Sequence, residues 1–436
     1  MSRIVRIFCL MAVLCLAIPP AAAGAAAPSL PPNCALTTKP SLETYLVCFP
    51  PFFWNRDLVV FAHGYEFAYP PSAPKLGEEQ WLIQLANGKT ITLPELVNAL
   101  GFGFATTSYS KNGLAVKEGV NEMKDLVAAV RAARPGVRNV YIVGASEGGL
   151  ITALSMERNA GTYKGGLALC GPVGDFQQQI NYWGDFRAAF DALFPGTLPP
   201  DAVNIPDPLM QDWVSSPSLA QLGVLGQLTN PANALKVGQL LALTRAPYDP
   251  ADTTTIGATT LGILSYNVLA TNEARVELGN IQPYDNTANL PLLAAGAAPY
   301  AAAPSPADVA AAIQPYQTSG QLTKALVTMH TLGDPIVPVW HEALYAAKVA
   351  AAGASSKLTV LPINRYGHCS FKPAEILFGF AMMLFQSNRM PIRMSEYHAV
   401  MDATEPGAYA EFQALNAQFG DLSQTRIFLP AVSGQR

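Results

Sequence analysis

The stretch "VYIVGASEGGLI", residues 140–151, constrains the fold of this chain more than any other. Its first half is β-branched and aromatic, as in a buried strand, and its second half has a helix-like pattern. Between them Gly144, Gly148 and Gly149 flank Ser146 and let the chain turn sharply. Such a turn exposes the serine at the carboxyl edge of a sheet, beside a helix N-terminus that stabilises negative charge. The motif predicts a nucleophile or, alternatively, an ordinary serine in a strand–helix connection.

Strands and helices alternate on both sides of this turn. Buried strands are predicted at 44–49, 57–64, 102–110, 138–144, 165–171, 325–333 and 358–363. Helices are predicted at 93–101, 117–134, 147–158, 339–352 and 373–386. A hairpin-like Asn-Gly turn lies within "ANGKTITL". The alternation predicts an α/β chain with a mostly parallel sheet covered by helices on both faces.

The regular alternation is interrupted between Gly171 and the strand at 325–333. A crossover between parallel strands needs only about a dozen residues with a helix, so the excess is the size of a domain. Helical patterns occur in it at 182–194, 217–229 and 232–244. The predicted organisation is therefore a core in two parts with an insertion and a C-terminal extension; its segments are 34–171, 172–320, 321–390 and 391–436.

The N-terminus has the pattern of an export signal. Arg3 and Arg6 precede an apolar run at 7–18, and small residues follow up to a predicted cleavage after Ala23. Residues 1–23 are thus predicted as a signal peptide of a secreted or periplasmic protein, with an uncleaved anchor as the alternative. The apolar run is too short to span a membrane, and no later span is expected after cleavage. A net charge of −4 offers no basic face for nucleic acid.

A nucleophilic serine needs a base and an acid that orients the base. Of the downstream histidines, only His368 lies on a loop directly after a predicted strand. His330 lies inside an apolar strand, His341 near a helix start and His398 after the last regular element. Asp334 follows the strand at 325–333, where it could orient the imidazole or simply cap the next helix. Ser146, Asp334 and His368 occur in the chain order Ser, Asp, His, each just past a strand.

An oxyanion hole requires two backbone N–H groups beside the serine. One candidate is Glu147, the residue after Ser146. The other is Tyr65 in the loop that follows the strand at 57–64. His63 in the same loop is expected to be structural.

With these residues in place, the chain resembles α/β-hydrolase-fold serine esterases and lipases. The resemblance rests on "AHGY", "GASEGG", "LGDPIVP" and "YGHC", and covers roughly 44–171 and 325–387. It implies an α/β-hydrolase fold, an acyl-enzyme mechanism without metal or organic cofactor, and a helical lid at 172–320 inserted before the strand that carries the acid. "GASEGG" and "GDPIVP" are also similar to the prolyl-oligopeptidase branch, although the chain has no room for that branch's propeller.

The insertion carries the clues to substrate class. Trp183 and Phe186 begin an aromatic stripe over 182–194, which either binds an apolar substrate group or buries the lid against the core. The few charges in 205–320 favour a hydrophobic ester, such as a lipid or polyester. Two alternatives stay open: a serine peptidase, and a binding protein on a hydrolase scaffold. The sequence leaves the oligomeric state undetermined.

Four cysteines remain after removal of the predicted signal: Cys34, Cys48, Cys170 and Cys369. An even number in an oxidising compartment suggests two disulfides, and no C-x-x-C pair supports a zinc site. Three pairings are possible. Cys34 and Cys48 are close in sequence, and in the implied sheet Cys170 and Cys369 share the carboxyl edge. Cys34–Cys48 and Cys170–Cys369 are therefore predicted, with reduced thiols at the second pair as the alternative.

Overall fold

The computed structural model describes residues 32–84 and 90–387, together with 402, 407, 409–411, 413 and 414. The predicted signal peptide, His398, the predicted Asn-Gly turn and most of the predicted C-terminal extension lie outside these residues.

Eight of the described strands form one sheet, in the order β1-β2-β6-β3-β7-β8-β9-β10. Their bounds are β1 Cys34–Thr38, β2 Thr44–Cys48, β3 Leu58–Ala62, β6 Gly103–Thr107, β7 Val140–Ala145, β8 Gly165–Leu169, β9 Ala325–Gly333 and β10 Leu358–Tyr366. β2 runs antiparallel to β1 and β6, and the pairs from β6 to β10 are all parallel. β4 (Leu82–Gln84) and β5 (Thr90–Thr92) form a separate antiparallel pair.

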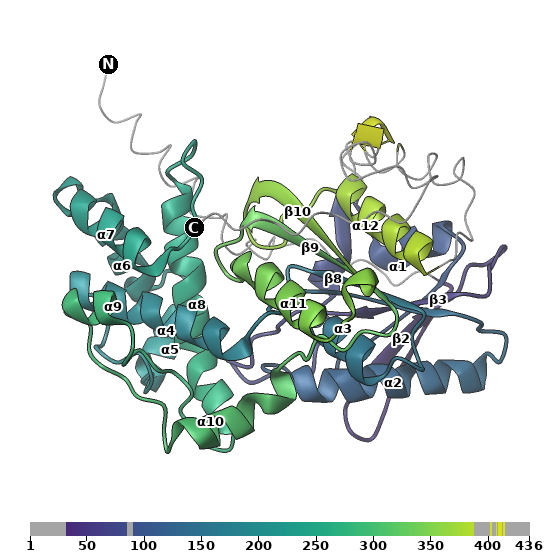
Figure 1. Ribbon diagram of the computed structural model, residues 1–436, viewed down its shortest axis with the longest axis horizontal. Helices are drawn as coiled ribbons and strands as arrows, with labels where there is room; N and C mark the ends of the chain where they lie inside the picture. Colours follow the sequence, from purple (N-terminus) through teal and green to yellow (C-terminus); the bar gives the residue numbers. More distant parts are fainter. Residues whose placement is uncertain are drawn as a thin grey trace.

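Helices cover both faces of the sheet, which explains its apolar strands. Every residue of β3, β6 and β8 is buried, as expected for strands with helices on each side. α1 (Leu93–Ala99) and α12 (Pro373–Gln386) pack on one face. α2 (Val116–Ala133), α3 (Glu147–Arg158) and α11 (Trp340–Ala351) pack on the other (Figure 1). α2 shows the expected one-sided burial, and its apolar positions recur at helical spacing.

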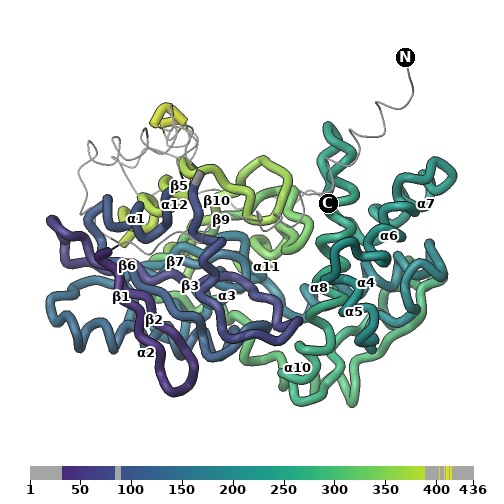
Figure 2. Tube along the Cα trace, turned by 180° about the vertical axis from the view of Figure 1, so that it is seen from behind, coloured from purple at the N-terminus to yellow at the C-terminus, as the bar shows by residue number. Residues whose placement is uncertain are grey.

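The segment between β8 and β9 folds as a helical body beside the sheet (Figures 1 and 2). Its helices are α4 Phe176–Leu193, α5 Asp207–Trp213, α6 Leu219–Thr229, α7 Ala234–Thr244, α8 Thr255–Glu277, α9 Leu290–Ala294 and α10 Pro306–Ile313. It has its own hydrophobic cluster, which also includes Ile336 and Val337 from the segment after β9. In the part of the chain that is described, no helix is both long and apolar enough to cross a membrane.

Several elements were not predicted from sequence, namely β1 and the helices α5, α8, α9 and α10 of the insertion. β1 lies in the Pro-rich start of the chain and forms the edge of the sheet, where it pairs with β2. Its side chains are mostly exposed, so it lacks the apolar pattern of a buried strand. α8 has Gly, Thr and apolar residues around its whole circumference, without a polar stripe. Helices packed on several sides show no amphipathic period, so the periodicity on which sequence prediction depends is absent.

Candidate active site

The strand order, the antiparallel β2 and the helices on both faces give this chain the α/β-hydrolase fold. In open α/β sheets, functional groups collect outside the carboxyl ends of the parallel strands. Ser146 directly follows β7, Asp334 follows β9 and His368 lies two residues beyond β10. Three candidate side chains distant in sequence therefore start from one edge of the sheet.

Ser146 occupies a strained turn between β7 and α3. Its φ of 56° and ψ of −120° are unusual for a residue with a side chain, and such strain costs about 1–3 kcal/mol. The neighbouring glycines make the turn possible, because a Cβ at Gly144 would collide with the carbonyl of Gly148, and one at Gly148 with the carbonyl of Ala62. The Ser146 backbone N–H is fixed by the Leu169 carbonyl at 2.9 Å.

His368 connects the serine to the aspartate. Its Nε2 lies 2.9 Å from Ser146 Oγ, and its Nδ1 lies 2.7 Å from Asp334 Oδ2. A neutral His368 with the proton on Nδ1 would donate to Asp334 and leave Nε2 as the acceptor for the hydroxyl. The imidazole can thus take the proton of Ser146 without any rearrangement.

The Asp334 carboxylate is fully buried and held by several donors. Oδ1 accepts the backbone N–H groups of Ile336 and Val337, both at 2.9 Å. Burial alone would raise the pKa of Asp334, but its electrostatic interaction with His368 and the hydrogen bonds from His330 and His368 lower it to about 2. The carboxylate therefore remains ionised at neutral pH.

His330 lies next to Asp334, outside the candidate triad, and is also fully buried. Its Nδ1 is 3.2 Å from Glu342 Oε1, and its Nε2 is 3.5 Å from Asp334 Oδ2 and 2.6 Å from the Val337 carbonyl. Burial would lower the pKa of His330, but the hydrogen bonds and charges of Asp334 and Glu342 raise it to about 10. A buried imidazolium thus stands between two carboxylates. Sequence reasoning identified a packed core histidine but missed this charge, because Glu342 reaches it from another element.

His341 has the opposite environment. Its Nδ1 accepts the N–H of Gly174 at 3.0 Å, so its Nε2–H donates to Gln179 Oε1 at 2.7 Å. Burial lowers the pKa of His341 well below its ordinary value, and the ring is neutral. This histidine fastens the start of α4 to α11 and does not reach Ser146.

The two candidate oxyanion-hole residues also lie at this edge. Gly64 is next to the serine, since a Cβ there would be 3.3 Å from Ser146 Cβ. The Gly64 N–H donates to Gln80 Oε1 at 2.6 Å, whereas the backbone N–H groups of Tyr65 and Glu147 have no acceptor among the described residues. His63 is buried, stacks on Tyr109 and has its pKa lowered to about 4 by burial, as expected for a structural residue.

The two aromatic candidates of the insertion differ in position. The ring of Trp183 is partly exposed and stacks on Tyr266 with ring centroids 4.7 Å apart. Phe186 has an exposed fraction of 0% and lies in the core of the insertion. Phe186 therefore packs the helices together and lines no accessible pocket, which is the packing alternative of the sequence analysis.

α8, one of the helices that sequence did not predict, contacts three loops of the candidate site. Thr259 Oγ1 is 2.7 Å from the hydroxyl of Tyr366, which lies two residues before His368. Gly262 packs against Ile336, two residues after Asp334. At the far end Glu273 accepts the Tyr65 hydroxyl at 2.9 Å. At about 1.5 Å per residue, the helix is long enough to extend along the carboxyl edge from β3 to β10.

Both predicted disulfides are present. Cys34–Cys48 joins β1 to β2, and Cys170–Cys369 joins the end of β8 to the histidine loop, with Cα atoms 5.4 Å apart. Cys369 Sγ lies 3.6 Å from His368 Nε2. Among the described residues, the cluster with metal-like spacing is Cys170, His368 and Cys369. Its sulfurs are bonded to each other and cannot act as thiolate ligands, so this cluster does not fit a metal.

Comparison with known proteins gave structural matches only. No family model matches the chain, and no curated protein matches it. Candida antarctica lipase A is 12% identical, with 90% of this chain and 87% of that one covered and a TM-score of 0.41. Feruloyl esterase B from Aspergillus oryzae is 14% identical, with coverages of 77% and 73% and a TM-score of 0.41. Pyrococcus horikoshii acylaminoacyl peptidase is 12% identical, with coverages of 75% and 35% and a TM-score of 0.35.

The chain thus spans about a third of the length of the peptidases it matches. Similarity at this level leaves the activity to be argued from the site itself.

Proposed function

We propose that the protein is a serine hydrolase that cleaves a hydrophobic carboxylic ester through an acyl-enzyme, with Ser146 as nucleophile, His368 as base and Asp334 as orienting acid. The observation that carries the proposal is the continuous relay from Ser146 Oγ through His368 to Asp334. The strained backbone of Ser146 adds support, because a serine without a role would not need it.

The proposed reaction has two steps, acylation of Ser146 and hydrolysis of the acyl-enzyme, and each begins with attack of an oxygen nucleophile on a carbonyl carbon. His368 Nε2 takes the proton of Ser146 while Oγ attacks the ester carbonyl carbon. The N–H groups of Tyr65 and Glu147 stabilise the resulting oxyanion. Protonation of the leaving alcohol by His368 breaks the C–O bond and leaves the acyl group on Ser146. Water, deprotonated by His368, then attacks the acyl carbonyl, and the acid departs as the Ser146 hydroxyl is restored.

Three acids near the oxyanion hole, of which Glu66 and Glu147 are buried and Glu273 is partly buried, favour an ester over a free peptide amine. Glu147 accepts the Ala115 N–H at 2.8 Å, and Glu273 accepts the Leu114 N–H at 3.0 Å as well as the Tyr65 hydroxyl. Burial raises the pKa of both carboxyls, and it raises that of Glu66 to about 7. Carboxyls with raised pKa values that already bind the protein's own donors are poor anchors for an ammonium group.

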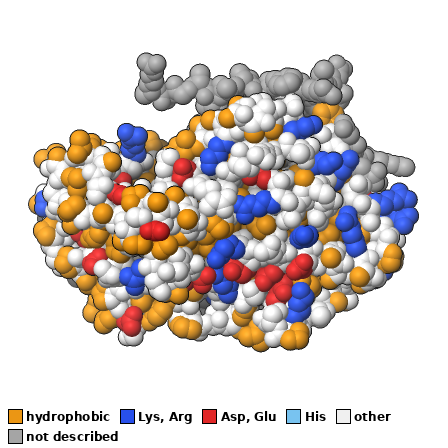
Figure 3. All heavy atoms as spheres, turned by 60° about the horizontal axis from the view of Figure 1, so that its bottom comes forward, with side chains coloured by type: hydrophobic (Ala, Val, Ile, Leu, Met, Phe, Trp, Pro, Cys, Tyr) orange, Lys and Arg blue, Asp and Glu red, His pale blue; other side chains and the backbone are white. Residues whose placement is uncertain are grey.

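The insertion supports a hydrophobic substrate and is proposed to act as a lid. It exposes large apolar side chains, with exposed fractions of 73% for Leu219, 84% for Leu235 and 70% for Leu290. Figure 3 shows apolar side chains gathered on the left, over these helices. Exposed apolar surface of this kind commonly marks contact with an apolar partner or substrate. α8 contacts Tyr65, Ile336 and Tyr366, which lie beside the oxyanion hole, the acid and the base. These contacts would couple movement of the insertion to access to Ser146.

The test compares the wild type with Ser146→Ala on nitrophenyl esters of increasing chain length, emulsified triglyceride, a polyester film and an aminoacyl-naphthylamide. Ester turnover that depends on Ser146, together with labelling of Ser146 by a fluorophosphonate, is the expected result. Faster turnover of the naphthylamide than of every ester would instead select the peptidase alternative. An unlabelled Ser146 in the folded protein would select a non-catalytic binding protein.

A further inference from the structure

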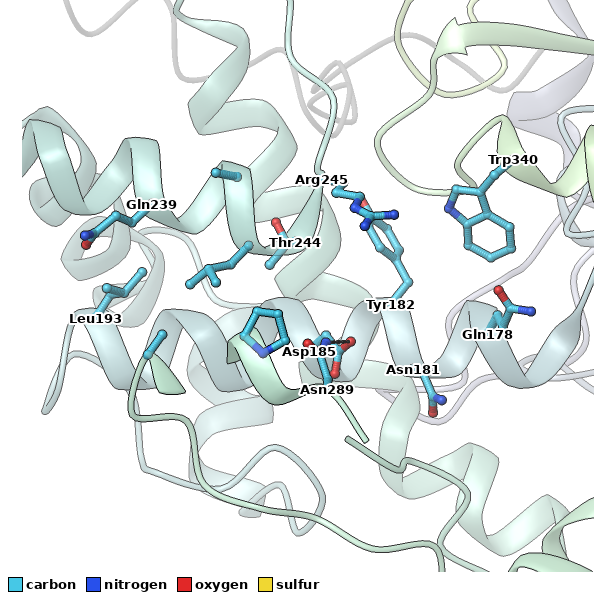
Figure 4. Close-up of a pocket in the computed structure, with 14 residues that line it drawn as sticks. Gln178, Asn181, Tyr182, Asp185, Leu193, Gln239, Thr244, Arg245, Asn289 and Trp340 are labelled. Atoms are coloured by element: carbon cyan, nitrogen blue, oxygen red, sulfur yellow. Dashed lines mark hydrogen bonds between the residues drawn. The ribbon is translucent and has the colours of Figure 1, made fainter. Parts of the chain in front are cut away.

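A cavity of about 840 Å³ lies between helices of the insertion and the start of α11, apart from Ser146. Its walls come from α4, α7, the start of α9 and the first residue of α11 (Figure 4). None of the candidate triad residues lines it. Its volume falls within the range of about 300–1,000 Å³ found for small-molecule sites.

Arg245 is the cation of this cavity. The arginines and lysines of 172–320 are Arg187, Lys236, Arg245 and Arg275. Arg187 is buried and paired with Asp191, and Arg275 donates to Asn204. In the described part of the chain, the Arg245 guanidinium has neither an ion pair nor a hydrogen bond.

The backbone conformation of Arg245 indicates a functional role for its side chain. It ends α7 in the left-handed conformation, with φ 54° and ψ 30°. Glycine or asparagine is preferred in this conformation at helix ends, because a larger residue is strained there. A residue that is unfavourable for the local backbone conformation, and that makes no stabilising contact in return, is expected at functional sites. Here the effect of the arginine is to place a free cation on the cavity wall.

Rings and apolar groups surround this cation. Trp340 and Tyr182 line the cavity with Leu243 and Pro291, and the Trp340 indole N–H has no acceptor among the described residues. Figure 4 shows Arg245 and Tyr182 between Trp340 on one side and Gln239 on the other.

Asp185 is the acid of the cavity, but its oxygens are already engaged. One accepts the Tyr284 hydroxyl at 2.9 Å, and the other accepts the Asn289 side-chain N–H at 2.8 Å (Figure 4). Asp185 therefore does not neutralise Arg245 through a contact. Arg245 and Trp340 therefore offer donors to a ligand in the cavity, as do the side-chain amides of Asn181 and Gln239, and donors of this kind suit an anion.

We propose that this cavity binds a carboxylate carried on an aromatic body, with Arg245 pairing with the carboxylate and Trp340 and Tyr182 contacting the rings. Planar guanidinium groups bind carboxylates through paired hydrogen bonds. The cavity adjoins the candidate site, since Tyr182 donates its hydroxyl to the Pro335 carbonyl at 2.8 Å, beside Asp334. The carboxylate belongs either to the acid released by hydrolysis or to an uncleaved substrate that has a free acid group. Binding itself does not require that the chain is a hydrolase.

The binding test uses the full chain with Ser146→Ala, so that no probe is consumed, and isothermal titration with 2-naphthoate and its neutral analogue 2-naphthamide. The naphthoate is expected to bind more tightly than the amide. Arg245→Gln should weaken naphthoate binding by about tenfold or more and leave the amide unchanged. Trp340→Leu should weaken both ligands alike. Lys236→Gln on the same helix removes a charge outside the cavity and should change neither.

Two results of the binding test would overturn the proposal. One is equal binding of naphthoate by the Arg245→Gln and Lys236→Gln proteins. The other is loss of naphthoate binding when Ser146 of the otherwise wild-type chain is blocked by a phosphonate, which would place the ligand at Ser146.

The source of the carboxylate is resolved by kinetics on the wild type. Inhibition by naphthoate that is not competitive with a nitrophenyl ester, and is relieved by Arg245→Gln, identifies the released acid. A preference for the half-ester of an aromatic dicarboxylic acid over its diester, lost in Arg245→Gln, identifies the uncleaved substrate. Either result supports the cavity as a carboxylate site, and the absence of both effects contradicts it. If the chain hydrolyses no ester, the titration still tests the cavity alone.

Discussion

The indole N–H of Trp183 donates to the carbonyl of Ile336 at 3.0 Å. The backbone N–H of the same Ile336 donates to Asp334 Oδ1. Ile336 therefore links helix α4 of the insertion to the candidate acid through its own two peptide groups. Gln179 adds a second donor to the Ile336 carbonyl at 3.0 Å. The insertion thus positions the acid loop as well as standing beside the sheet.

Trp183→Phe removes this donor and keeps a ring beside Tyr266. Because Gln179 remains, we expect turnover of all esters to fall by about five- to tenfold, in line with the loss of one hydrogen bond of about 1 kcal/mol. Trp183→Ala should also change chain-length preference, since the ring is lost. Phe186→Leu is the control, because it should lower the melting temperature and leave the preference unchanged. An equal change of preference in Phe186→Leu would contradict the placement of Phe186.

Ser146→Ala and His368→Ala should each reduce ester turnover by about 10⁴-fold or more, because the members of a triad act as a unit. Asp334→Asn should also be severe, since it imposes the wrong tautomer on His368. Circular dichroism checks that each variant is folded. A loss of the same size in a folded His341→Gln protein would show that the base is misassigned.

His330 predicts a stability change at alkaline pH. Its pKa is raised to about 10 in the folded chain from an ordinary value of 6.5, so its contribution is complete below pH 6.5 and is lost as the pH rises through 10. Relative to His330→Gln, the wild type should lose up to about 1.4 kcal/mol of unfolding free energy per pH unit in this window. Urea denaturation at pH 6 to 10 measures it.

His341 is the matched control for this prediction. Its pKa is lowered on folding, so protonation of the unfolded chain removes stability as the pH falls below 6.5. The wild type compared with His341→Gln should therefore lose stability toward acid. If the unfolding free energy, relative to the Gln variant, changed with pH in the same direction for both histidines, the charge assignment of His330 would be wrong.

The two disulfides should have separable effects. Replacing Cys170 and Cys369 by Ser frees the loop that carries His368, so we expect both a lower melting temperature and lower turnover, with a stability loss of about 3–5 kcal/mol. Replacing Cys34 and Cys48 affects only the edge strands β1 and β2. It should lower stability and leave turnover per folded molecule intact. Lower turnover only in the second variant would contradict the assignment.

Much of the fold and the candidate relay could be predicted from sequence because their signals are local. β9 and α12 were predicted with the observed bounds, since a buried strand and a capped, apolar helix each have a recognisable pattern. Ser146, Asp334 and His368 each follow such a strand, and parallel strands bring their carboxyl ends to one edge. Strand order and residue type were therefore sufficient to group them.

The rest depended on tertiary contacts. α8 has no amphipathic period, because it is packed on several sides, and its contacts with Tyr65 and Tyr366 join positions far apart in the chain. The charge of His330 depends on Glu342, and the cavity beside Arg245 depends on the meeting of four helices. Periodicity, turns and chain order are properties of neighbouring residues and can be read from the sequence. Burial, charge pairing and cavity shape arise only when distant segments pack, so the tertiary structure alone decided them.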